Sequence, residues 1–173
     1  MSTPTSGRLV DGAHTLPLRI YYEDTDAAGI VYYANWLRFL ERRRTEMLRL
    51  LGQQHSALRD ERGINWVVRR CTIDYLKPAR LDDTIEVVTR CGVPRGASLD
   101  MLQEAWRGPA LLVRADLLVA CMAADGRPAR LPSEVRTILS QIATKNAGPT
   151  GTAPGESPRS RHIPIQPFEP TEI

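Results

Sequence analysis

The alternation of hydrophobic and polar positions predicts five β-strands along the middle of the chain. Residues 16–22 mix aliphatic and aromatic side chains as a strand does, and four later segments share this character, each bounded by Gly, Pro or Asp: 64–76, 84–92, 98–106 and 110–122. The turns between the last three strands are short. Because parallel neighbours need a crossover of a dozen or more residues, these strands are predicted to form an antiparallel meander.

A long helix is predicted between the first and second strands. Asn35 is the expected N-cap and Gly52 the expected terminator. The helical period places five apolar residues on one face: Leu37, Leu40, Met47, Leu48 and Leu51. Arg44 falls on or beside this face, where it is either paired with Glu41 or partly exposed. One helix packed on five strands is a single α+β layer pair.

The remaining segments are expected to be a polar connection, a terminal helix and two tails. Residues 53–63 are polar and connect the long helix to the second strand, and residues 131–144 fit a short helix that begins near Pro132. Residues 1–15 are small and polar, and residues 145–173 hold six prolines without an amphipathic period. We therefore expect one domain over residues 16–144 between disordered tails.

Composition excludes several classes of function. The chain has 173 residues and a net charge of +3, but its basic residues are scattered and form no nucleic-acid-binding block. No segment approaches the roughly 18–20 unbroken apolar residues of a membrane helix, and the start lacks a secretory pattern, so we expect a cytoplasmic protein. Cys71, Cys91 and Cys121 are odd in number and far apart, which favours reduced core thiols over disulfides or a zinc site.

The segment EDTDAAGIVYYANW, residues 23–36, is the strongest candidate for chemistry. It places three acids in four residues directly before the long helix. A helix N-terminus favours negative charge by roughly 0.3–1 kcal/mol, and its free N–H groups can stabilise an oxyanion. Acids here also serve as capping and solubilising residues. A Ca²⁺ or Mg²⁺ site is a weaker alternative, because no alternating ligands with a closing Glu follow.

Two segments carry a family resemblance. The run RIYYEDTDAAGIVYYANWLRFLERRRTEML, with VVRRCTIDYLKPARLDDTIEV downstream, closely resembles the hotdog-fold thioesterases of the 4-hydroxybenzoyl-CoA type. Among them it is most similar to the acyl-CoA thioesterases associated with the bacterial Tol-Pal envelope system, and the similarity spans residues 18–131. The resemblance implies a hotdog fold, in which a curved antiparallel sheet wraps a long central helix. It also implies a homodimer or homotetramer whose sheets join and whose active sites lie at the interface.

The resemblance assigns the catalytic role to Asp26. The carboxylate at this position attacks the thioester carbonyl or activates a water that does so, with no metal or cofactor. Backbone amides around Val31, Tyr32 and Tyr33 polarise the carbonyl oxygen and begin the acyl pocket. Glu23 and Asp24 are expected to be structural.

Coenzyme A carries phosphates that bind guanidinium or ammonium groups. The candidates flank the second strand or follow in the turns after it: Arg69, Arg70, Lys77, Arg80 and Arg95. Each is also a plausible solvated surface charge. His14, His55 and His162 lie in the tails or in the polar connection and are expected to be solvated, which argues against a Ser-His-Asp or Cys-His site.

Tyr33 leaves the acyl preference open. The envelope-associated branch commonly has histidine at this position, whereas the hydroxybenzoyl branch resembles Tyr33. Three functions are compared: an acyl-CoA thioesterase, an envelope-associated adaptor that binds acyl groups with little turnover, and a hotdog dehydratase. The last lacks the histidine expected near the helix entry. Acyl carrier protein and phospholipid-synthesis enzymes are further expected partners.

Overall fold

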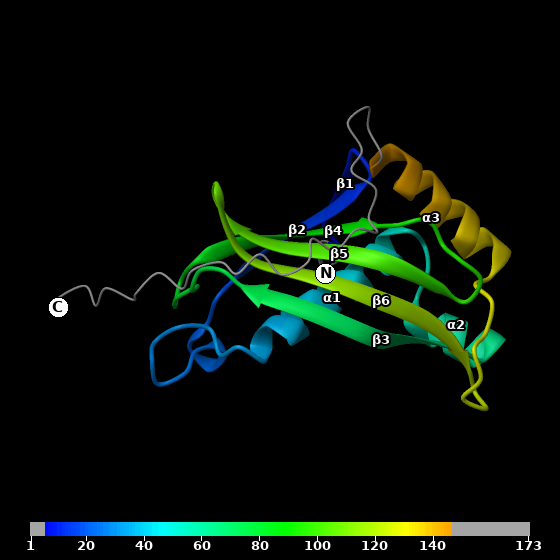
Figure 1. The fold of residues 1–173 in the computed structure, drawn as a ribbon, viewed down its shortest axis with the longest axis horizontal. Helices are drawn as coiled ribbons and strands as arrows, with labels where there is room; N and C mark the ends of the chain where they lie inside the picture. Colours follow the sequence, from blue (N-terminus) through cyan, green and yellow to red (C-terminus); the bar gives the residue numbers. More distant parts are fainter. Residues whose placement is uncertain (1–5, 147–173) are drawn as a thin grey trace, which may run out of the picture.

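The computed structural model describes residues 6–146, in which six antiparallel strands form one curved sheet over a central helix (Figure 1). The elements are β1 (Arg8–Val10), β2 (Ala13–Arg19), the short 3₁₀ helix η1 (Tyr22–Asp24), α1 (Asn35–Leu50), α2 (His55–Arg62), β3 (Ile64–Tyr75), β4 (Thr84–Cys91), β5 (Ser98–Arg107), β6 (Ala110–Ala123) and α3 (Ser133–Asn146). The strand order is β1-β2-β4-β5-β6-β3. The sheet therefore has β1 and β3 at its edges.

The prediction of five strands was wrong, because β1 lies within the residues expected to be a tail. Val10 pairs with Ala13 across a two-residue turn in which Asp11 and Gly12 have φ values of 47° and 75°. Positive φ at both central residues is the hairpin turn that Asp-Gly favours. The turn sets the register of β1 and begins β2 at Ala13, three residues before the predicted strand.

The other four predicted strands are confirmed, with ends that differ by one residue. β4, β5 and β6 form the predicted antiparallel meander, and β3 pairs with β6 beyond it. The register of β3 shifts between Val68 and Arg70, so Arg69 is the extra residue of a bulge. Beyond the bulge, Cys71 and Ile73 pack against the core.

The long helix is confirmed, but its cap and its buried face differ from the prediction. Ala34 is the N-cap, and the Asn35 side chain instead donates to the Asp24 carbonyl oxygen, 3.0 Å away. Leu37 is 45% exposed, whereas Trp36 and Phe39 are buried. The buried face of α1 is thus shifted from the predicted one so that it includes the aromatic residues, and Leu37 is exposed.

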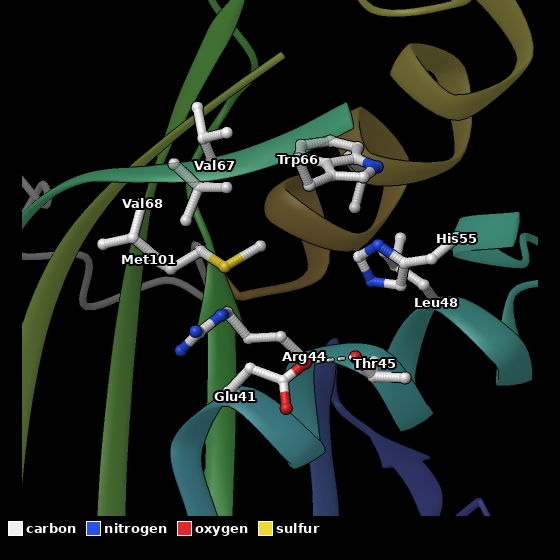
Figure 2. Close-up of a pocket in the computed structure, with 11 residues that line it drawn as sticks. Glu41, Arg44, Thr45, Leu48, His55, Trp66, Val67, Val68 and Met101 are labelled. Atoms are coloured by element: carbon white, nitrogen blue, oxygen red, sulfur yellow. Dashed lines mark hydrogen bonds between the residues drawn. The ribbon is translucent and has the colours of Figure 1, made fainter. Parts of the chain in front are cut away.

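Arg44 is paired with a glutamine of β5 rather than with Glu41. Its Nη1 donates to Gln103 Oε1 at 2.7 Å, and the fully buried Gln103 amide donates to the Leu40 carbonyl and to Thr89 Oγ1. Arg44 is half-buried, which agrees with the alternative that it is partly exposed, and burial lowers its pKa. Figure 2 shows Arg44 beside Glu41 and Thr45, facing β3.

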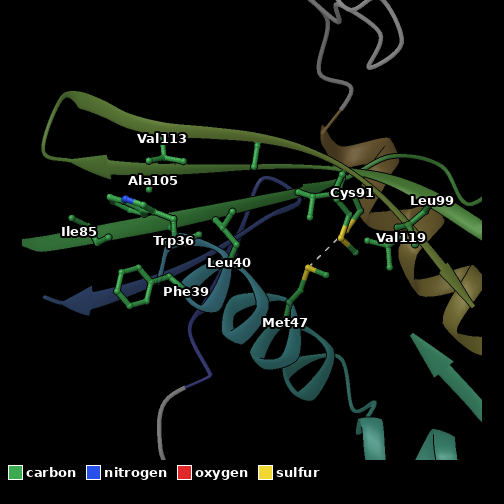
Figure 3. Packing of buried hydrophobic residues seen from close by; sticks show 14 of the residues in the cluster. Trp36, Phe39, Leu40, Met47, Ile85, Cys91, Leu99, Ala105, Val113 and Val119 are labelled. Atoms are coloured by element: carbon green, nitrogen blue, oxygen red, sulfur yellow. Dashed lines mark hydrogen bonds between the residues drawn. The ribbon is translucent and has the colours of Figure 1, made fainter. Parts of the chain in front are cut away.

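The core fills the space between α1 and the sheet. Trp36 and Phe39 meet edge to face with centroids 5.7 Å apart, and the Cys91 and Met47 sulfur atoms are 3.8 Å apart (Figure 3). All three cysteines are free, and burial raises the pKa of the Cys91 thiol to about 12 and that of Cys121 to about 11. Cys91 and Cys121 are buried in the core as predicted, whereas Cys71 is only half-buried.

Two further helices close the sheet at the end remote from the α1 N-terminus (Figure 1). α2 replaces the expected polar connection: it buries Leu58 and ends at Gly63, whose φ of 63° is left-handed. The predicted terminal helix is confirmed as α3, which buries Val135 and Leu139. Residues 147–173, most of the predicted C-terminal tail, lie outside the described residues.

His14 is buried, so the expectation that it is solvated was wrong. Its Nε2 is 2.7 Å from the Ser6 carbonyl oxygen, which can only accept, so Nε2 carries the proton. Its Nδ1 is buried without a hydrogen-bond partner among the described residues. Burial, with the charge of Arg43 in the same direction, lowers the pKa of His14. The neutral imidazole therefore belongs to the folded state.

We predict that His14 makes stability fall as the pH is lowered below about 6.5, the pKa of an unfolded histidine. In this range the unfolded chain binds a proton that the folded His14 refuses, so unfolding is favoured. The melting temperature should drop between about pH 7.5 and about pH 5.5. The drop should be smaller in His14→Gln, which retains a donor for Ser6. An equal drop in both proteins would contradict this role for His14.

Candidate active site

The candidate catalytic residue, Asp26, lies at the tip of a small hairpin before α1. The Asp26 N–H donates to the Ile30 carbonyl at 2.9 Å, and the Gly29 N–H donates back to the Asp26 carbonyl. Gly29 has a φ of 70°, which this tight turn requires and which glycine adopts without strain. Asp26 Oδ1 accepts the Ala28 N–H at 2.9 Å, and within residues 6–146 no donor reaches Oδ2. The exposed carboxylate is therefore oriented, with one oxygen available for chemistry.

Asp24 anchors this hairpin to the start of α1. Its side chain accepts the Tyr21 N–H, and its carbonyl oxygen accepts both the Tyr32 N–H at 2.9 Å and the Asn35 side chain. Glu23 is exposed. Asp24 thus makes the structural contacts that its position led us to expect.

The three backbone amides predicted to polarise a substrate carbonyl are not equivalent. The Val31 N–H donates to the Ala79 carbonyl at 2.8 Å, and the Tyr32 N–H is occupied by Asp24. In the part of the chain that the structure describes, neither the Tyr33 nor the Ala34 N–H donates to another residue. These two amides at the entry to α1 are therefore free to bind an oxyanion, and Ala34 was missed by sequence reasoning.

Aromatic rings hold Tyr33 in place. The Tyr75 hydroxyl, at the end of β3, donates to the Tyr33 carbonyl at 3.2 Å, and the two rings meet edge to face. The Tyr32 ring lies 4.7 Å from that of Tyr33. The adjacent Tyr33 hydroxyl raises the pKa of Tyr32, and the nearby Asp26 carboxylate contributes in the same direction. The hairpin carboxylate, the tyrosine pair and the α1 entry thus form one surface.

The candidate CoA-binding residues are all exposed, but they divide by position. Lys77 and Arg80 lie in the β3–β4 loop, and the Arg80 backbone forms an isolated antiparallel β-bridge with Ile30 of the Asp26 hairpin. Arg69 and Arg70 lie midway along β3. Arg95 lies at the far end of β4, which at about 3.3 Å per residue is roughly 25 Å from the hairpin. Of these candidates, Arg80 is the one whose contact with the hairpin is seen in residues 6–146, and Lys77 lies three residues before it in the same loop.

No metal site accompanies this surface. Among residues 6–146, no three His, Cys, Asp or Glu side chains gather in a way that could hold a metal ion. His55 is half-buried, against the expectation of a solvated position, and lies on α2 away from the hairpin. His162 lies outside the described residues. None of the helices described here is long and apolar enough to span a membrane.

The chain is similar to known thioesterases in sequence and in fold. Over 135 residues the chain is 39% identical to the acyl-CoA thioesterase YbgC of Haemophilus influenzae. The matched region covers 78% of this chain and 99% of the relative. It is 44% identical over 121 residues to the acyl-CoA thioester hydrolase YbgC of Escherichia coli, covering 69% and 90%. A probable thioesterase from Bartonella henselae has the same fold, with a TM-score of 0.66, 35% identity, and coverage of 69% of this chain and 99% of that one.

The thioesterase-like superfamily matches residues 21–139, which include the Asp26 hairpin, α1 and all strands from β3 to β6. The six-stranded sheet around α1 is the hotdog-like fold of that superfamily. The chain therefore belongs to the thioesterase-like superfamily.

Proposed function

We propose that this chain is an acyl-CoA thioester hydrolase that converts acyl-CoA and water into a free acid and coenzyme A. The observation that carries the proposal is the Asp26 carboxylate on a short hairpin that leads into the α1 entry, where the Tyr33 and Ala34 amides are free. Its curated relatives are named for the same activity. No cofactor enters the proposed reaction.

The proposed reaction uses the carboxylate and the α1 entry together. Asp26 either attacks the thioester carbonyl carbon or takes a proton from the water that attacks it. The carbonyl oxygen gains negative charge and is stabilised by the Tyr33 and Ala34 N–H groups, each such donor being worth roughly 3 kcal/mol. The carbon–sulfur bond then breaks, and the thiolate leaves with the electron pair and is protonated to the thiol. On the first route, water then hydrolyses the acyl-Asp26 anhydride, which releases the acid and restores the carboxylate. On the second route, the oxygen of the attacking water ends in the acid.

The phosphates of coenzyme A are proposed to bind Lys77 and Arg80 of the same chain. Both are exposed in the β3–β4 loop, which contacts the hairpin through Arg80, and their flexible, positively charged side chains suit phosphate oxygens. Arg69, Arg70 and Arg95 would contribute to a site only across an interface with another copy.

A homodimer formed through β3 is part of the proposal. β3 is twelve residues long and, within residues 6–146, pairs only with β6, so its other edge is open. Val68 and Tyr75 are both more than 40% exposed on this strand. A long, partly apolar open edge is a template for pairing with another strand, and a second copy of β3 is a matching partner.

We predict a solution mass of at least twice the chain mass of 19.3 kDa. Sedimentation at micromolar concentration gives this mass directly and also separates a dimer from a tetramer. A mass of one chain at that concentration would exclude an active site that is completed by a partner.

The finer placement within the superfamily is also proposed. The DTDAAGIVYYANW run supports the 4-hydroxybenzoyl-CoA type and the Tol-Pal-associated branch, in which acyl carrier protein or phospholipid-synthesis enzymes would be partners. Three free thiols fit the reducing cytoplasm. Co-purification of the tagged chain from its own host would test these partners.

The activity is tested by identifying products. Purified protein is mixed with butyryl-, palmitoyl- and benzoyl-CoA, and the free acid and coenzyme A are measured by mass spectrometry. We expect both products in equal amounts from at least one substrate. Acid without coenzyme A, or no product from any substrate, would contradict the proposal.

A further inference from the structure

A pocket of about 130 Å³ lies between α1, β3, α2 and α3, away from the Asp26 hairpin (Figure 2). Its walls are mainly apolar: Leu48, Val67, Val68, Met101, Val119 and Leu139. A dry apolar cavity of about 150 Å³ is large enough to bind benzene, whereas whole ligand sites span about 300–1,000 Å³. The pocket therefore suits the end of a hydrocarbon chain rather than an entire acyl-CoA.

One face of α1 leads from the proposed reaction site to this pocket. Leu37, Glu41, Thr45 and Leu48 recur at the three- and four-residue spacing that places side chains on one helix face. The last three line the pocket, and Leu37 is the exposed leucine between the pocket and the α1 entry. At 1.5 Å per residue, Thr45 lies about 15 Å along the axis from the helix start.

β3 borders the same face of α1. Tyr75, at one end of the strand, contacts Tyr33, and Trp66 and Val68, toward the other end, line the pocket. Between them, Cys71 lies close enough to the Arg44 guanidinium for their charges to affect each other's pKa. A chain that starts at the α1 entry can thus follow α1 and β3 to the pocket, a span too long for a short or single-ring acyl group.

The pocket ends at a wall shared with a second, polar hollow. The two hollows have three lining residues in common: Thr45, His55 and Trp66. Figure 2 shows Trp66 and His55 together at the pocket end opposite Val68. Trp66 Nε1 and His55 Nε2 are buried without hydrogen-bond partners in the described part of the chain, so these two atoms do not tie the rings to a polar neighbour. Burial lowers the pKa of His55, which keeps the wall uncharged at neutral pH.

We infer that the substrate is a long-chain acyl-CoA whose chain lies along α1 and ends in this pocket, with Trp66 and His55 setting the longest chain that fits. The inference rests on the proposed function, because it names the substrate class of that site. Each buried methylene group contributes about 0.8 kcal/mol, so a chain that fills the pocket is preferred over one that stops short.

The test compares the chain-length profiles of three proteins, using butyryl-, palmitoyl- and longer saturated acyl-CoAs. Wild type should have a higher kcat/KM for palmitoyl-CoA than for butyryl-CoA. Thr45→Phe fills the pocket and should lower the palmitoyl-to-butyryl ratio by about tenfold or more. Trp66→Ala removes the wall and should raise the ratio for chains longer than palmitoyl by a similar factor. Circular dichroism checks that each variant is folded.

The matched control is Trp66→Phe, which keeps an aromatic wall but removes the indole nitrogen, and its profile should stay close to that of wild type. If Trp66→Ala does not fold, the Thr45→Phe ratio decides alone. Wild type that prefers butyryl-CoA, or ratios that are equal in wild type and the folded variants, would overturn the inference while leaving acyl-CoA hydrolysis standing. Absence of any hydrolysis by wild type would instead overturn the proposed function itself.

Discussion

Replacing Asp26 with asparagine is expected to lower kcat for acyl-CoA hydrolysis by at least about 10². Asparagine keeps the shape of the side chain, and its Oδ1 can still accept the Ala28 N–H, so the hairpin should persist. It cannot act as a nucleophile or take a proton from water. The expected loss therefore comes from chemistry rather than from folding.

Asp24→Asn is the matched control for this substitution. Asp24 lies two residues away and also accepts a backbone N–H, but its contacts anchor the loop and do not face the proposed substrate. Asparagine retains the acceptor, so this variant should keep most of the activity. Equal losses in both variants would show that the effect reflects loop structure and not the Asp26 carboxylate.

Removing the Tyr33 N–H should have the second largest effect. Tyr33→Pro lacks this donor, and the loss of one oxyanion donor typically lowers kcat by about 10²–10³. Proline is tolerated near a helix start, where the N–H has no helical partner. We expect kcat to fall with a smaller change in KM, because the donor binds charge that develops only in the transition state.

Tyr33→Phe separates the amide from the side-chain hydroxyl. Phenylalanine keeps the N–H and the ring that packs against Tyr75, and it removes only the hydroxyl that meets Tyr32. Its kcat should stay within about tenfold of wild type, well above that of Tyr33→Pro. If the two variants are equally impaired, the Tyr33 amide is not the oxyanion donor.

Much of the sheet could be predicted from the sequence because its strands are long, bounded by turn residues and joined by short connections. β1 was missed because it has only three residues, although Asp11-Gly12 between the apolar Val10 and Ala13 is a recognised hairpin signal. The orientation of α1 was harder to predict. Leu37 fits one apolar stripe and Trp36 another, and only packing against the sheet decides that Trp36 points inward.

The candidate site was only partly predictable, because its parts meet through contacts between distant residues. The motif located Asp26 and the α1 entry. It could not show that the Val31 N–H donates to the carbonyl of Ala79, 48 residues later in the chain. Nor could it show that the Tyr75 hydroxyl donates to the Tyr33 carbonyl. The pocket combines residues of six elements (α1, α2, α3, β3, β5 and β6), and its residues carry no shared motif in the sequence.

An ¹⁸O label tests whether the reaction passes through a covalent intermediate at Asp26. Under single-turnover conditions in ¹⁸O-labelled water, a covalent acyl-Asp26 intermediate places label in the Asp26 carboxylate if water attacks the Asp26 carbonyl. General-base attack by water places label only in the acid product. Label in the peptide that contains Asp26, detected by mass spectrometry, would therefore establish the covalent route.

The most direct test of the central claim is the rate of thiol release from acyl-CoA by wild type and Asp26→Asn, measured side by side on proteins of the same oligomeric mass. The proposed mechanism predicts turnover by wild type and a loss of at least about 10² in the variant. Equal rates in the two proteins, or no thiol release by wild type from any acyl-CoA, would contradict it.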